Sequence, residues 1–78
     1  MTVEELGVIL NDMYSNSPDG QAVAMIHLFG IKYAVIIKNH GYTSTEIIRA
    51  ANINKSYAAE LSKGIKLASF VDVKTEYM

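Results

Sequence analysis

Positively charged side chains gather in one stretch of this chain, and their chemistry suits phosphate binding. Lysine and arginine neutralise phosphate oxygens and also hydrogen-bond to the edges of nucleic-acid bases. The net charge of the whole chain is only −1, so binding of this kind by one copy is expected to be weak and steeply salt-dependent. The charged residues of the stretch are Arg49, Lys55, Lys63 and Lys66, with Glu60 as the one carboxylate among them.

Other kinds of chemistry are not indicated by the residue pattern. Ser56 has no histidine near it in sequence and no nucleophile-elbow pattern around it. His27 and His40 have no carboxylate three or four residues away, and the chain has no cysteine. No glycine loop of the kind that cradles phosphates is present. We therefore predict no enzymatic activity, no metal site and no cofactor, and we expect His27 to be a hydrogen-bonded core or interface residue.

The charged stretch is predicted to form two short helices joined by a tight turn. Thr43 followed by Glu46 matches a capping box, which starts a helix over residues 44–51. Asn52 is expected at the corner, because asparagine tolerates positive φ better than any residue except glycine. Asn54 is suited to cap the second helix, which is predicted to end at Lys63-Gly64.

The apolar residues of this stretch are spaced so that both helices turn one face inward. Together with the turn they give the pattern E-I-x-x-x-A-x-I-x-x-S-Y-x-x-x-L, within which Ala51 and the following alanine, Ala58, are small enough for a close, angled approach of two helices. With this pattern, residues 43–64 resemble the helix-turn-helix of phage repressors and Cro-like regulators. The residues expected to face inward are Ile47, Ile48, Ala51, Ile53, Ala58 and Leu61.

The resemblance implies that the second helix lies in the major groove of double-stranded DNA. Lys55 would then contact a guanine or a phosphate, and Glu60 would either accept from cytosine or repel the phosphates. Tyr57 would lie at the flank of the helix, within reach of a phosphate. The outer face implied by the resemblance carries Asn54, Lys55, Ser56, Ala59, Glu60 and Lys63. The implied phosphate contacts are Thr43, Ser44 and Thr45 at a helix N-terminus, with Arg49, Lys63 and Lys66 as clamps.

The first half of the chain is predicted to supply two further helices. Apolar residues at helical spacing indicate a helix over residues 3–14, and residues 21–39 are apolar on nearly every face, as in a buried central helix. A strand over residues 31–37 is the alternative for part of that segment, because β-branched residues are frequent there. His27, Gly30 and Lys32 interrupt the segment, so it is not expected to span a membrane.

The C-terminal residues alternate between apolar and polar types. Period-two alternation over residues 70–77 favours a strand, which would need a partner such as the same strand of a second copy. A frayed terminus over residues 70–78 is the alternative.

Taken together, the sequence predicts a single domain over residues 1–78. Its fold is expected to be mostly α, with about four helices, a helix-turn-helix and a possible short C-terminal β-strand. The predicted function is sequence-specific binding of double-stranded DNA, as a small repressor-like transcriptional regulator or as the DNA-targeting module of a larger machine. A cytoplasmic homodimer is expected. The alternative is a protein-interaction module that uses an apolar surface near Phe29 and Tyr33, with a helix-turn-helix that does not contact DNA.

Overall fold

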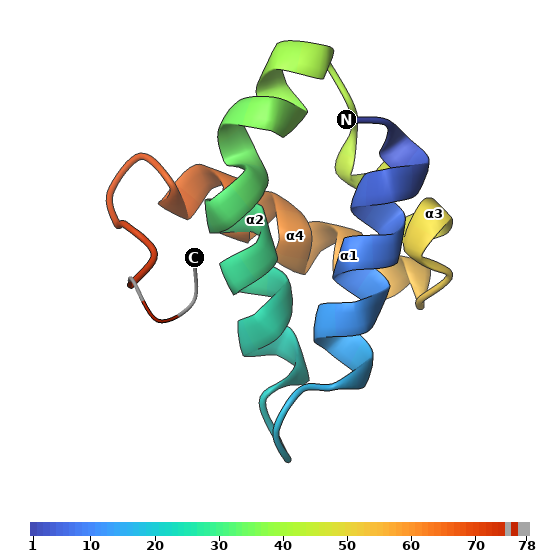
Figure 1. Cartoon of the computed structure of the whole chain (residues 1–78), viewed down its shortest axis with the longest axis vertical. Coiled ribbons are helices and arrows are strands. Elements are labelled where there is room, and N and C mark those ends of the chain that lie inside the picture. The colour runs from blue at the N-terminus through green and yellow to red at the C-terminus, as the bar shows by residue number, and fades with distance from the viewer. Residues whose placement is uncertain (75, 77–78) are drawn as a thin grey trace.

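The computed structural model describes residues 1–74 and residue 76, and it is built from helices (Figure 1). Within these residues the elements are α1 (Val3–Ser15), α2 (Ala22–His40), α3 (Ser44–Ala51), the short 3-10 helix η1 (Lys55–Tyr57) and α4 (Ala58–Leu67). The predicted mostly helical fold with four helices is confirmed. Residues 31–37 belong to α2, so the alternative of a strand there is wrong.

Two of the helices begin with the same hydrogen-bonded cap. At α3, the Thr43 hydroxyl accepts from the backbone N–H of Glu46 at 3.1 Å, and the Glu46 carboxylate accepts from the N–H of Thr43 at 3.0 Å. Thr2 and Glu5 make the matching pair at the start of α1. These bonds satisfy backbone donors that have no partner inside the helix. The cap at Thr43 was predicted from the sequence, whereas the one at Thr2 was not.

Helices α2 and α3 also end alike, each with a residue in the left-handed conformation. Gly41 has φ of 70° and Asn52 has φ of 57°. The residue after each of them folds its N–H back onto the helix, from Tyr42 to the carbonyl of Ile37 and from Ile53 to the carbonyl of Ile48. The corner predicted at Asn52 is confirmed.

The helices pack in an interleaved order, α2 against α4 and α1 against α3 (Figure 1). Each crossing is close because a glycine lies in it. A Cβ atom built on Gly64 of α4 would lie 2.6 Å from the carbonyl oxygen of His27 in α2, and one built on Gly30 would lie 2.9 Å from the Gly64 backbone. In α1, Gly7 meets Ala50 of α3 in the same way. Gly64 therefore lies inside α4 and does not end it, contrary to the prediction.

The core lies between these four helices, and among the residues that the structure describes only apolar side chains are buried in it. Its largest member is Phe29, which is fully buried. Phe29 is therefore no part of an exposed partner surface, contrary to the sequence-based alternative. The other members of the cluster are Leu6, Leu10, Ile26, Ile37, Ile47, Ile48, Ala51 and Leu61.

Helix α2, with 19 residues, is the longest element of the described residues. By length and composition alone it is also apolar enough to cross a membrane. In the fold, however, its buried face, which includes Ile26, Phe29 and Ala34, packs against α1 and α4. This is how the central helix of a helical domain is placed.

Beyond α4 the chain makes a turn and then runs without regular secondary structure over residues 71–74. The N–H groups of Phe70 and Val71 both donate to the carbonyl of Leu67. No strand forms over the described part of the predicted segment; its residues 75 and 77 lie outside the part of the chain that the structure describes. An alternating pattern produces a strand only where a neighbouring strand takes up its backbone hydrogen bonds, and residues 1–74 offer none.

Candidate nucleic-acid interface

The second helix of the motif starts in two stages. The side chain of Asn54 accepts from the N–H of Ser56 at 2.9 Å and so opens the single turn of η1. Regular α-helix follows only from Ala58. The predicted cap at Asn54 is confirmed, but the α-helix begins later and ends later than its sequence suggested.

Most of the predicted contact residues are exposed on α3, η1 and α4. On α4, exposed Ala59, Lys63 and Lys66 follow one another at helical spacing. Their stripe continues into η1 through Ser56, and the buried Leu61 lies on the opposite side of the helix. The outer face therefore carries short side chains near its start and cationic side chains towards its end. The other exposed candidates are Thr43, Thr45, Arg49, Asn54 and Lys55.

The remaining three candidates are half-buried, and each is bonded to another helix. The hydroxyl of Ser44 lies 2.7 Å from that of Ser62, which joins α3 to α4. The hydroxyl of Tyr57 accepts from that of Tyr14 in α1 at 3.4 Å, and the two rings meet edge to face. These two candidates thus help to fix the angle between the helices. Whether they also contact a ligand stays a prediction.

The third half-buried candidate, Glu60, is held on the α2 side of its helix. Its Oε1 lies 2.8 Å from Nε2 of His27, and its Oε2 accepts from Nζ of Lys63 at 3.1 Å. The hydrogen bond from His27, and after it the one from Lys63, lowers the pKa of the Glu60 carboxyl. The carboxylate is thus held between His27 of α2 and Lys63 of the outer stripe, and does not stand free on the outer face where the sequence had placed it. The expectation that His27 is hydrogen-bonded is confirmed.

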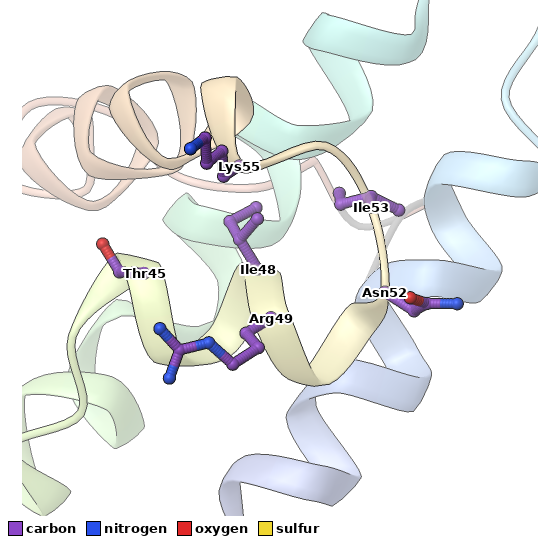
Figure 2. A pocket seen from close by; sticks show the side chains of 6 residues that line it. All are labelled: Thr45, Ile48, Arg49, Asn52, Ile53 and Lys55. Atoms are coloured by element: carbon purple, nitrogen blue, oxygen red, sulfur yellow. The ribbon is translucent and has the colours of Figure 1, made fainter.

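A depression of about 240 Å³ separates α3 from the start of η1 (Figure 2). Its floor is apolar, made by the buried Ile48 and the half-buried Ile53. Arg49 and Thr45 project from α3 on one side, and Lys55 lies across the gap on the other. Two cations therefore face one hollow from two different elements, which the sequence spacing alone had not indicated.

The cations of this surface differ in how they are engaged. Lys63 pairs with Glu60. Within residues 1–74 and 76, no ion pair is formed by Arg49, Lys55 or Lys66. Unpaired, exposed cations on adjoining elements are suited to hold an anionic polymer. The described residues contain no group of three or more His, Cys, Asp or Glu that is placed to hold a metal ion.

Comparison with protein families shows what the chain is similar to. A family model described as an HTH-like domain matches residues 2–74, which includes all four helices and the turn between α3 and η1. No match was found among curated proteins or among solved structures.

Proposed function

The chain belongs to the family of HTH-like domains, and from this premise we propose that it binds double-stranded DNA through η1 and α4. In this binding mode the second helix of the motif enters the major groove, and the helix before it lies across the backbone. The single observation that carries the proposal is that Arg49 of α3 and Lys55 of η1 line one hollow, and that the exposed stripe of α4 runs on from Ser56, the residue after Lys55.

Base recognition is assigned to the start of the second helix. Lys55 and Ser56 are exposed there and can donate to acceptors on base edges. Ala59 is short enough to let the helix approach a thymine methyl group. Asn54 uses its side-chain oxygen as a cap, which leaves its amide N–H groups for a base or a phosphate.

Phosphate binding is assigned to the residues that border this region. Arg49 and Thr45 lie on the α3 side of the depression, and Lys66 lies at the far end of the α4 stripe. Each phosphate that a cation neutralises releases counterions from DNA, so such contacts set the salt dependence of binding.

We further propose that the protein acts in the cytoplasm as a small regulator of the repressor or Cro type, without catalytic activity. Two copies would read a palindromic site, with half-sites about 10 base pairs apart if both lie on one face of the duplex. A role as the DNA-targeting module of a larger assembly uses the same surface and the same contacts.

The test is a fluorescence titration of labelled mixed-sequence duplex DNA at low and moderate salt. Lys55→Ala combined with Lys66→Ala removes two cations that form no ion pair within the described residues. The wild type should bind at low salt, and the double variant should bind far more weakly. The slope of log affinity against log salt should also be smaller by about 0.9 for each lost phosphate contact.

The matched control is Lys32→Ala combined with Lys74→Ala. It removes the same charge from exposed positions outside the helix-turn-helix. If the control loses as much affinity as the Lys55/Lys66 variant, the attraction is general and the proposed surface is wrong. Absence of wild-type binding at low salt would remove the DNA-binding proposal itself.

A second candidate function, protein binding, is favoured by a groove of about 650 Å³ between α2 and the C-terminal segment. Half-buried Tyr33 lines it from α2 and Val71 lines it from the segment. Two large apolar side chains are exposed on these same two elements, Val35 and Phe70. A partner bound there would be insensitive to the Lys55/Lys66 variant, which separates this candidate from the first.

A further inference from the structure

We propose that His27 is a positioning residue for DNA binding: it holds the carboxylate of Glu60 against α2 and so keeps negative charge off the surface that meets the phosphates. The inference rests on the proposed function. Its basis is the contact between two residues that lie 33 positions apart in sequence and are joined by a hydrogen bond of 2.8 Å.

The contact is built into the fold at the close crossing of α2 and α4. Gly64 of α4 packs against the backbone of His27 itself. Glu60 stands one helical turn before Gly64, on the same side of α4. The crossing therefore brings the imidazole and the carboxylate together while both residues remain within regular helix. Both side chains are largely shielded, with 29% of His27 and 26% of Glu60 exposed.

The imidazole can donate from Nε2 whether it is neutral or protonated. In the neutral ring the proton sits on one nitrogen, and the acceptor beside Nε2 favours that tautomer. The second carboxylate oxygen is taken by Lys63. The carboxylate is thus fixed from two sides, and its charge is opposed by a cation of the same helix.

Without His27 the carboxylate would be tied only to Lys63, whose side chain is 63% exposed. An exposed i,i+3 pair is weak, because holding two long side chains in one geometry costs entropy. Glu60 lies beside the exposed stripe, so a freed carboxylate reaches the side of α4 that is proposed to face DNA. A carboxylate near the phosphates lowers affinity for DNA.

The experiment compares two substitutions of similar size. His27→Leu fills the space but has no donor, whereas His27→Gln retains an N–H donor of similar reach. Duplex binding at low salt should weaken about fivefold in His27→Leu, which corresponds to one charge–charge contact in water. His27→Gln should bind like the wild type. In a Glu60→Gln background, which removes the charge, both His27 variants should bind equally well.

A second readout needs no DNA. The carboxyl carbon of Glu60, followed by NMR against pH, should titrate at higher pH in His27→Leu than in the wild type, because the hydrogen bond from His27 lowers this pKa. Circular dichroism establishes that each variant is folded. If His27→Leu does not fold, His27→Met, which also lacks an N–H donor, takes its place in the same comparison.

The outcomes separate the inference from its premise. If the wild type binds DNA and His27→Leu binds equally well, or loses the same factor in the Glu60→Gln background, His27 acts only through packing and the inference is overturned. If the wild type itself does not bind, the proposed function fails and the inference fails with it. A fivefold loss that disappears in the Glu60→Gln background supports both.

Discussion

Gly64→Ala tests how closely α2 and α4 approach one another. A Cβ atom at this position would lie 2.6 Å from the carbonyl oxygen of His27, 2.9 Å from its Cα and 3.1 Å from its carbonyl carbon. All three are backbone atoms within a helix, so no side-chain rotation relieves the overlap. The two helices would have to separate along a crossing that also contains Gly30.

Two opposing effects determine how far Gly64→Ala changes the free energy of unfolding. Overpacking a core typically costs about 1–3 kcal/mol, and contact with rigid backbone favours the upper end of that range. Replacing glycine by alanine inside a helix returns about 1 kcal/mol. We therefore expect a net loss of about 2 kcal/mol, which lowers the melting temperature of a domain of this size by about 8–16 °C.

The assay is urea and thermal unfolding followed by circular dichroism. Ala59→Gly, at an exposed position of the same helix, measures the helix-propensity effect alone and should cost about 1 kcal/mol. The reasoning is refuted if Gly64→Ala is more stable than the wild type by the amount that Ala59→Gly loses. That result would mean that the crossing has room for a methyl group.

Two further predictions concern the turns and caps. Asn52 has φ of 57°, where alanine is disfavoured by about 1–2 kcal/mol and glycine is not. The melting temperature of Asn52→Ala should therefore be clearly below that of the wild type, and that of Asn52→Gly should equal or exceed it. Equal melting temperatures for the two variants would contradict the left-handed corner. The backbone N–H of Thr43, and after it the Thr43 hydroxyl, lowers the pKa of Glu46 from its ordinary value of 4.5. The stabilising effect of the ionised Glu46 carboxylate is therefore present above pH 4.5, and it is lost as the pH falls through the lowered pKa of the folded state. Urea midpoints measured across this range should fall less in Glu46→Gln than in the wild type, and identical acid profiles would show that the capping charge is not linked to folding.

The features that sequence reasoning recovered are those determined by neighbouring residues. The cap of α3 needs only Thr43 and a glutamate three positions later, and the corner needs only an asparagine at position 52. The interactions that form these features join residues within one helical turn, so they can be predicted from the local sequence alone. The helix-turn-helix was therefore predictable in outline.

The features that were missed depend on residues far apart in the chain. Gly64 follows a lysine, as glycines that end helices often do, and only the opposing backbone of His27 explains why the helix continues through it. Glu60 likewise reads as a residue of the outer face until its partner on α2 is known. Over residues 70–74 no strand forms for the same reason, because alternation does not supply a partner strand.

The interleaved packing of the helices has a consequence for synthesis on the ribosome. The first two helices emerge before the elements that cover them, since α1 packs on α3 and α2 packs on α4. Domains generally fold as units during synthesis, so this core cannot close until residue 67 has left the exit tunnel. Until then the nascent chain presents α2, a helix with the length and hydropathy of a membrane segment. Chaperones that bind exposed apolar segments are expected to engage this chain early and to release it once α4 is complete.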